Sequence, residues 1–365
     1  MMKVAIIAPL VSAIREPQGG GSQAFISDLT RGLVGRGHKV DVYAASGSEI
    51  PGVNVIDTGI DPQSLIATLY RASASAAGES AAAMAAFAGV YSTVREIRYD
   101  VIHNHAFDAP AVELATALNA PVVHTLHLPP DAAVAAALGH AARGDEPPAV
   151  VCVSAFQASA WNAVVQVNAI IPPYVPTHVI PWSPAAGDGA VFAGRLSPEK
   201  GAAEAIDIAR AAGIAIDVYG DTYDAQYARE QIDPRRETPG VAVHEGVPRA
   251  SLWVVMARAA VVLCPARWDE PFGMAAAEAQ ACGTPVVAFK RGGLSEVVED
   301  GVTGFLVAPD DIQAAADSVR RATELSRSAC RNHAERHLDL ERSLNAYEQF
   351  YRRVIGPEVG TAVGK

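Results

Sequence analysis

Short apolar runs and amphipathic stretches alternate along the chain. Residues 3–10 form an apolar, β-rich run that is typical of a buried parallel strand, and the Gly-rich sequence GGGS follows at 19–22. Apolar residues then recur at helical spacing until glycines at 35 and 37 end the pattern: Phe25, Ile26, Leu29, Leu33 and Val34. The next segment, HKVDVYA, again reads as a strand. This part of the chain therefore predicts a β-α-β unit.

The same alternation continues through the first half. Strand candidates are YDVIHNH around residue 101, APVVHTLH around 122 and AVVCVSA around 151. Helical stretches separate them, as expected for strands joined by crossover helices. The first half thus predicts a doubly wound parallel sheet.

A change of composition divides the chain in two. Between about residues 172 and 189 the sequence is rich in proline and small residues, which suits a connection between domains. Strand candidates then resume with AVFAGRL, AIDVYGD, GVAVHEG, AAVVLCPA and TPVVAF, and a helix is predicted over 202–212. We expect an α/β protein of two Rossmann-like domains, residues 1–172 and 189–340, whose parallel sheets face a central cleft.

The last residues predict a helix with one apolar face. Five apolar residues there share helical spacing: Leu344, Tyr347, Phe350, Tyr351 and Val354. We expect residues 341–365 to form a helix that packs back toward the N-terminal domain and then ends in a frayed tail.

Composition and charge narrow the possible partners. Half of the 365 residues are hydrophobic and 19% are charged, which is typical of a globular enzyme. A net charge of -11 argues against nucleic acid or anionic lipid as a partner. The four cysteines form no Cys-x-x-Cys pair, and no apolar run is long enough to span a bilayer or resembles a targeting segment. A cytoplasmic protein without membrane insertion is expected, and nothing in the sequence indicates its oligomeric state.

The segment EPFGMAAAE places two carboxylates around the start of a predicted helix. Glu270 precedes the helix and Glu278 lies eight positions later, more than one turn inside it. Free backbone N–H groups at the helix start, near Phe272, Gly273, Met274 and Ala275, favour binding of a phosphate or a sugar hydroxyl. Glu270 can accept hydrogen bonds from sugar hydroxyls and Glu278 from those of a ribose.

This segment resembles the signature of glycosyltransferase family 4, the retaining enzymes with the two-domain GT-B fold. Its E-x(7)-E motif is matched by EPFGMAAAE, and GTPVV and GGLSEVV follow as the family's next turns. Gly292 and Gly293 suit a tight turn with close backbone approach. Glu296, three residues beyond, resembles a residue that the family keeps near the nucleotide, although a helix-capping glutamate is an equal interpretation.

A second match is GRLSPEKG, on the loop after the first strand of the second domain. Arg195 and Lys200 are two cations near the carboxyl end of a parallel strand, where they can neutralise a diphosphate in place of a metal ion. The resemblance assigns both positions to stabilising the departing diphosphate, which carries the charge that grows in the transition state. No Asp-x-Asp or His-carboxylate cluster suggests a metal site, and no cofactor is expected.

The first domain contributes a loop and two strand ends. GGGSQ resembles the family's Gly-rich loop, in which Gly20 and Gly21 let backbone N–H groups approach the donor, and Gln23 stands where many relatives have Glu. His127 matches the position that lies against the donor sugar in the family and is the expected catalytic residue of this domain. His105 is a further candidate site residue. His103 and His124 are expected to face away from the site.

Taken together, these matches predict a metal-independent retaining glycosyltransferase that moves a hexose from a nucleotide diphosphate sugar, with UDP as the commonest base in the family, to a hydroxyl of a soluble acceptor. Small-molecule donor and acceptor are the expected partners. The catalytic set is His127, Arg195, Lys200 and Glu270, and the donor set adds Gly20, Gly21, Phe272, Gly273, Met274, Ala275 and Glu278.

Three other interpretations are open at this point. A sugar-nucleotide epimerase or a phosphorylase can share the GT-B scaffold, although no lysine suggests pyridoxal phosphate. A Rossmann oxidoreductase requires Gly-x-Gly-x-x-Gly at its first helix, which GGGSQAF does not provide. A catalytically silent nucleotide-sugar-binding protein would not need Arg195, Lys200, Glu270 and Glu278 together.

Overall fold

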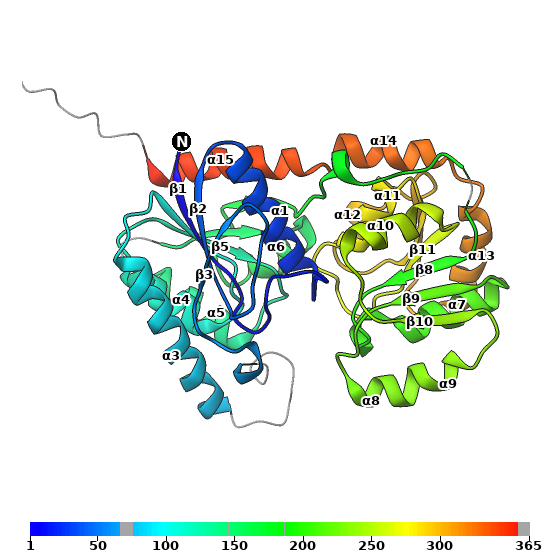
Figure 1. Ribbon diagram of the computed structural model, residues 1–365, viewed down its shortest axis with the longest axis horizontal. Coiled ribbons are helices and arrows are strands. Elements are labelled where there is room, and N and C mark those ends of the chain that lie inside the picture. The colour runs from blue at the N-terminus through cyan, green and yellow to red at the C-terminus, as the bar shows by residue number, and fades with distance from the viewer. Residues whose placement is uncertain (66–75, 145–146, 186, 357–365) are drawn as a thin grey trace, which may run out of the picture.

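The computed structural model describes residues 1–65, 76–144, 147–185 and 187–356, arranged as two halves side by side (Figure 1). The predicted frayed tail lies outside these residues from residue 357 onward. No helix among the described residues is both long and apolar enough to cross a membrane.

The first half is built on a seven-stranded sheet in the order β3-β2-β1-β4-β5-β6-β7, and every pair in it is parallel. Its strands are β1 Lys3–Ile7, β2 Lys39–Ala44, β3 Asn54–Asp57, β4 Val101–Asn104, β5 Val122–Leu126, β6 Ala149–Cys152 and β7 Ala169–Ile170. The α-helices described between them are α1 Gly21–Gly35, α3 Ala76–Arg95, α4 Ala109–Glu113, α5 Ala132–Ala141 and α6 Ala155–Trp161. This is the doubly wound sheet that the alternating pattern predicts.

The second half repeats the arrangement with six parallel strands in the order β10-β9-β8-β11-β12-β13. The strands are β8 Ala190–Ala193, β9 Ile216–Tyr219, β10 Val241–His244, β11 Val261–Cys264, β12 Val286–Phe289 and β13 Gly304–Val307. The helices are α7 Ala202–Ala212, α8 Ala225–Tyr227, α9 Asp233–Arg236, α10 Arg249–Arg258, α11 Met274–Ala281, α12 Leu294–Val297, α13 Ile312–Ala322, α14 Arg327–His337 and α15 Leu340–Ile355. The predicted fold class is confirmed.

The strand order reverses direction at one point in each sheet, between β1 and β4 and between β8 and β11. In open parallel sheets the loops that leave the carboxyl ends on either side of such a point diverge and open a crevice for ligands. Here the loops after β1, β8 and β11 are the ones that carry the Gly-rich sequence and the two family motifs. The topology therefore brings the predicted site residues to two facing sheet edges.

The last helix, α15, belongs to the core of the first half, on which it lies in Figure 1. Its apolar face, which includes Leu344, Tyr347 and Tyr351, is buried with Phe25 and Leu33 of α1 and with residues of β1 and β4. Amphipathic helices bury such a stripe because each apolar side chain removed from water stabilises the folded state. The chain thus returns to the first half after completing the second.

The two segments that connect the halves run next to each other. Val175 and Asp339 form an isolated parallel β-bridge, and the backbone N–H of Leu340 donates to the carbonyl of Val175 at 2.9 Å. The hydroxyl of Thr177 also donates to the carboxylate of Asp339. The passage into the second half and the passage back are therefore held together by hydrogen bonds.

Candidate active site

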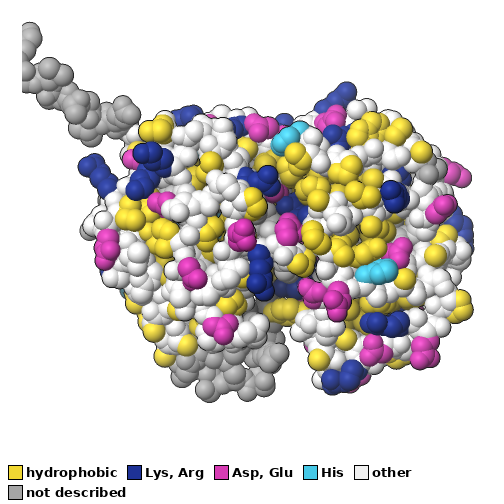
Figure 2. Space-filling model, in the orientation of Figure 1, with side chains coloured by type: hydrophobic (Ala, Val, Ile, Leu, Met, Phe, Trp, Pro, Cys, Tyr) yellow, Lys and Arg dark blue, Asp and Glu magenta, His cyan; other side chains and the backbone are white. Residues whose placement is uncertain are grey.

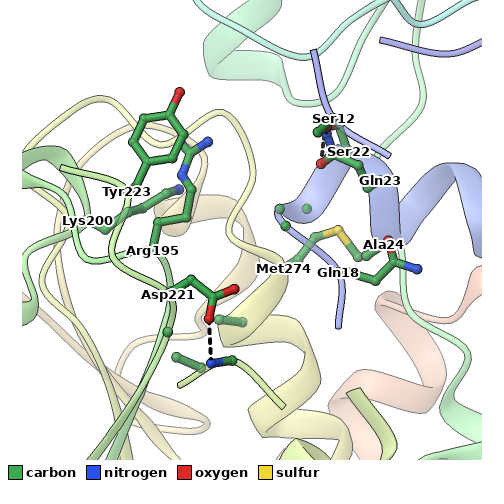
Figure 3. Close-up of a pocket in the computed structure, with 18 of the residues that line it drawn as sticks. Ser12, Gln18, Ser22, Gln23, Ala24, Arg195, Lys200, Asp221, Tyr223 and Met274 are labelled. Atoms are coloured by element: carbon green, nitrogen blue, oxygen red, sulfur yellow. Dashed lines mark hydrogen bonds between the residues drawn. The ribbon is translucent and has the colours of Figure 1, made fainter. Parts of the chain in front are cut away.

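A cavity of about 790 Å³ lies between the halves. Its first wall comes from residues 11–24 after β1 and from His127 after β5, and its second wall from the loops after β8, β9, β10 and β11. Figure 3 looks into it, with Gln18 and Gln23 on one wall and Arg195 and Lys200 on the other. Basic and acidic side chains also gather along the boundary between the halves in Figure 2. The cavity therefore combines hydrogen-bonding groups with cations.

Lys200 and Glu270 form an ion pair on the second wall. The ammonium Nζ of Lys200 lies 3.0 and 2.7 Å from the two carboxylate oxygens of Glu270. Trp268 holds both partners, because its indole N–H donates to Glu270 at 2.7 Å and its ring centre lies 4.8 Å from Nζ. A cation next to an aromatic face and a carboxylate is fixed in direction as well as in charge. Trp268 is a residue of the candidate site that the sequence did not reveal, although it stands only two positions before Glu270.

Two glycine contacts bring these loops together. Gly201, directly after Lys200, has a φ of 78°, and a Cβ there would lie 2.0 Å from the carbonyl oxygen of Pro265. Gly292 has a φ of 58°, and its Cβ would lie 2.3 Å from the carbonyl oxygen of Glu270. Only glycine tolerates both the backbone conformation and the close approach. The GG turn therefore supports the backbone that carries Glu270.

Arg195 lies beside Lys200 in the same wall (Figure 3). Its Nη2 is 3.2 Å from the carboxylate of Glu199, and its guanidinium lies 4.5 Å from the ring centre of Tyr223. Tyr223 and Asp221 come from the segment after β9 and also line the cavity. Stacking on Tyr223 leaves the edge of the planar guanidinium as its hydrogen-bonding face.

Helix α11 begins at the cavity, as the sequence predicts. Phe272, Gly273, Met274 and Ala275 all line it. The first intrahelical bonds are made by Ala276 and Ala277, whose N–H groups donate to Gly273. The N–H groups of residues 273–275 precede these bonds, and the N–H groups at a helix start favour an anion or a hydroxyl.

The Gly-rich loop forms the start of α1 on the opposite wall. Gly20 and Gly21 line the cavity, and Gly21 faces Met274 closely enough that a Cβ would lie 3.2 Å from the sulfur. The amide of Gln23 is engaged by its own neighbours, because Nε2 donates to the hydroxyl of Ser12 and Oε1 accepts from Ser22 (Figure 3). Gln23 therefore holds the loop after β1 against α1.

Glu278 lines the cavity but is not free. Arg249 donates to its Oε1 from Nε at 2.9 Å and from Nη2 at 2.7 Å. The remaining Nη1 donates to Asp28 of α1 at 2.9 Å, so the guanidinium joins the two halves. All three side chains are at most 10% exposed. Glu278, which we expect to bind the ribose hydroxyls, is therefore already oriented by Arg249.

Burial and neighbouring charges shift the pKa values of Asp28 and Arg249. Burial raises the pKa of Asp28 above its ordinary value, although Arg249 opposes the shift. Burial alone would lower the pKa of Arg249, but the two carboxylates outweigh it and raise the pKa. Arg249 therefore stays charged, and its charge opposes the effect of burial on the pKa of Asp28. Neither Arg249 nor Asp28 carried any motif in the sequence.

The histidines of the first half form one buried chain. His127 lines the cavity, and its Nε2 lies 2.8 Å from Nδ1 of His105, which is fully buried behind it. The expected alternation of His103 to the other face is wrong, because its Nδ1 lies 3.2 Å from Nε2 of His105, although His103 itself does not line the cavity. His124 lies apart from this chain, 3.1 Å from the amide of Asn104.

Glu296 is not among the residues that line the cavity. Its carboxylate accepts hydrogen bonds from the backbone N–H groups of Ala155 and Phe156, at 2.8 and 2.7 Å. These groups begin α6 of the first half, so Glu296 caps a helix across the boundary. The helix-capping interpretation describes its contacts here.

No group of three or more His, Cys, Asp or Glu within the described ranges is arranged to hold a metal ion. All four cysteines of the chain are free thiols.

Two protein-family models match the chain, one in each half. The model described as Glycosyltransferase Family 4 matches residues 19–179, and the one described as Glycosyl transferases group 1 matches residues 188–337. The two matched segments contain every candidate site residue named above.

Curated relatives agree with these matches. The D-inositol 3-phosphate glycosyltransferase of Kribbella flavida is 28% identical over 381 residues, which cover 87% of each chain. The protein of the same description from Mycobacterium tuberculosis H37Ra is 40% identical over 108 residues, or 27% of this chain and 22% of that protein.

Solved structures share the fold at low sequence identity. Sucrose-phosphate synthase from Thermosynechococcus elongatus superposes with a TM-score of 0.78 at 20% identity, covering 97% of this chain and 99% of that one. HepE of Anabaena in complex with UDP and glucose gives a TM-score of 0.74 at 22% identity, covering 96% and 99%.

Proposed function

The chain belongs to glycosyltransferase family 4, and from this premise and the geometry of its cleft we propose a retaining hexosyltransferase that uses a nucleoside diphosphate sugar, with UDP as the nucleotide. The acceptor is a hydroxyl group of a soluble molecule, and the reaction takes place in the cytoplasm. The observation that carries the proposal is the second wall of the cavity, where Arg195, Lys200, Glu270 and the start of α11 converge. UDP as the nucleotide is also supported by HepE, whose structure contains UDP and glucose.

Each group of the proposed donor (diphosphate, sugar and ribose) has a binding partner on that wall. Its diphosphate lies against Arg195 and Lys200, which supply two positive charges, and against the open N–H groups at the start of α11. Glu270 accepts hydrogen bonds from hydroxyls of the sugar, and the oxygen of Glu278 that Arg249 leaves free accepts from the ribose. Gly20 and Gly21 approach the phosphates or the acceptor from the first wall.

The proposed reaction proceeds on one face of the sugar. The bond between the anomeric carbon and the diphosphate oxygen breaks, and the bond to the acceptor oxygen forms on the same side. The acceptor proton passes to the departing phosphate, so the reaction balances without another base. Arg195 and Lys200 stabilise the negative charge that grows on the diphosphate, and His127 supports the cationic anomeric centre.

The proposal requires no metal ion, because the two side-chain cations provide the charge that a metal supplies in other transferases. It also requires no cofactor beyond the donor itself. The free thiols of the four cysteines suit a reducing compartment.

Thermal denaturation in EDTA tests donor binding and metal independence together. We expect UDP to raise the Tm, since a ligand at about 100 times its Kd stabilises the folded state by about 2.7 kcal/mol. GDP and ADP serve as matched nucleotides, and added Mg²⁺ should change nothing. No shift with any nucleotide would contradict the proposal, and a shift that appears only with Mg²⁺ would contradict its metal independence.

The variant Glu270→Gln distinguishes an effect on sugar transfer from an effect on nucleotide binding. The amide keeps the shape but removes a charged acceptor, so we expect kcat to fall about 100-fold. Binding of UDP alone, which has no sugar, should be unchanged or tighter, because a negative charge near the diphosphate is lost. Steady-state kinetics and calorimetric titration with UDP measure the two effects. Glu335→Gln, which removes a surface carboxylate paired with Arg331, is the control. Equal losses of kcat and UDP affinity would contradict the assigned role.

A further inference from the structure

Arg249 is the first residue of α10 and binds groups from both halves. Its backbone N–H donates to the carboxylate of Glu16, in the loop after β1, at 3.0 Å. Its guanidinium donates to Asp28 of α1 through Nη1 and to Glu278 of α11 through Nε and Nη2. The ring centre of Trp253 lies 5.0 Å from the guanidinium carbon. The position of this arginine therefore depends on the first half as well as on the second.

The guanidinium binds Glu278 through one carboxylate oxygen only. Nε and Nη2 lie 2.9 and 2.7 Å from Oε1, and Oε2 has no hydrogen-bond partner within the described part of the chain. Arginine and a carboxylate frequently form two parallel bonds instead, one to each oxygen. A bond of that kind would occupy Oε2. The observed geometry therefore leaves one oxygen of a cavity-lining carboxylate available to a ligand.

Asp28 supplies a reason for this geometry. Its carboxylate lies 2.9 Å from Nη1, which is not part of the guanidinium edge formed by Nε and Nη2. The bond to Nη1 opposes a rotation of the guanidinium that would bring Nη2 toward Oε2 of Glu278. Charge acts in the same direction, because the single positive charge of Arg249 is shared between two buried carboxylates. Glu278 is then only partly neutralised and stays a strong acceptor for a hydroxyl.

From these contacts we propose that Asp28 is a positioning residue for the donor, because by holding Arg249 it keeps Oε2 of Glu278 open to the ribose hydroxyls. The inference rests on the proposed function, in which Glu278 binds the ribose. It adds a residue of the first half that does not itself line the cavity. Helices α1 and α10 lie on the two sides of the boundary between the halves (Figure 1). The ribose contact is therefore complete only when the two halves are together.

Asp28→Ala removes the carboxylate and leaves every cavity-lining residue unchanged. The probes are UDP and its 2′,3′-dideoxy analogue, which lacks both ribose hydroxyls. We expect the wild type to bind UDP about tenfold more tightly than the analogue, the size of a hydrogen bond to a charged group. In the variant, UDP binding should weaken about tenfold while binding of the analogue changes less than about twofold. Calorimetric titration measures both affinities, and equal weakening of the two ligands would overturn the proposal.

Three further variants separate positioning from a general loss of structure. Asp207→Ala is the matched control, because Asp207 also accepts from an arginine, Arg235, at 2.9 Å and does not line the cavity. It should leave the preference for UDP unchanged. Asp28→Asn retains an oxygen that can accept from Nη1, so it should recover part of the preference. In the Glu278→Gln background, Asp28→Ala should reduce the preference no further, because both residues act on one contact. An additional loss there would contradict the assigned role.

Binding and turnover distinguish this inference from the proposed function. A wild type that prefers UDP over the dideoxy analogue, loses the preference in Asp28→Ala and transfers no sugar would support the inference and contradict the transferase activity. A wild type that transfers sugar but binds UDP and the analogue equally would overturn the inference alone.

Discussion

Lys200→Ala is expected to lower kcat by about 100- to 1,000-fold and to weaken UDP binding about tenfold. Nζ of Lys200 is held by Glu270 and lies against the ring of Trp268, so it already points where the diphosphate is proposed to sit. Removing it takes away a positive charge that stabilises the departing diphosphate in the transition state. It also leaves the carboxylate of Glu270 uncompensated beside the phosphates, which adds repulsion.

Two variants make this result interpretable. Lys290→Ala removes an exposed lysine that follows β12 in the same half and does not line the cavity, and it should behave as the wild type. Lys200→Arg keeps the positive charge but spreads it over a planar guanidinium. It should therefore recover UDP binding better than kcat. Steady-state kinetics and titration with UDP give both quantities. Wild-type turnover and UDP affinity in Lys200→Ala would remove the lysine from the site.

Arg249→Leu is expected to lower the free energy of unfolding by about 3–5 kcal/mol. The arginine is the only partner described for the carboxylates of Asp28 and Glu278, which are 5% and 7% exposed. Without it, two buried carboxylates face each other across the boundary between the halves. Denaturant unfolding followed by fluorescence measures the loss. Adding Asp28→Asn and Glu278→Gln should restore part of it, because buried amides cost less than unpaired charges.

The control for this prediction is Arg36→Leu. Arg36 also joins distant segments through Glu341 and Glu348, but Glu341 is 60% exposed, so its loss should cost less than about 1 kcal/mol. If both variants lost a similar free energy of unfolding, burial would not explain the larger effect expected for Arg249→Leu.

The deficit of Arg249→Leu should depend on pH. Burial raises the pKa of Asp28 in the folded state, so the folded state binds this proton more tightly than the unfolded state. That contribution to stability is present below about pH 4 and is lost as the pH rises through the raised pKa. In the wild type, the ion pair between Arg249 and Asp28 offsets this loss of stability. The deficit of the variant should therefore be largest near neutral pH and shrink toward about pH 4.

Local patterns were sufficient for most of the fold. The apolar stripe from Phe25 to Val34 predicted α1, and the predicted helix over 202–212 coincides with α7. Strands β3, β7 and β13 were not anticipated. The pair AI in β7 is too short to show any period, and GFLV in β13 is a four-residue run without alternation. Such segments become strands because a neighbouring strand offers its hydrogen-bonding edge, which is a tertiary effect.

The site was predictable only where its residues share a motif. Arg195, Lys200 and Glu270 were expected to lie together because their loops have recognisable sequences, and all three line the cavity. Arg249 and Asp28 were not, since they are separated by 221 positions and meet only when the halves do. His103 was misplaced because the alternation along β4 was counted incorrectly, although the sequence contained the correct answer. Tyr351 was recognised only as part of an apolar stripe, because no local pattern shows that its hydroxyl reaches His103.

The return of α15 to the first half has a consequence for biosynthesis. Its side chains, among them Tyr347 and Phe350, complete a core whose other buried members lie between residues 2 and 171. A ribosome therefore releases the last part of that core only after the whole second half has emerged. The nascent first half must wait with its apolar groove beside α1 uncovered, which is the kind of surface that chaperones bind. A chain that stops before residue 340 would keep that groove open, so it should aggregate unless the missing helix is supplied as a separate peptide.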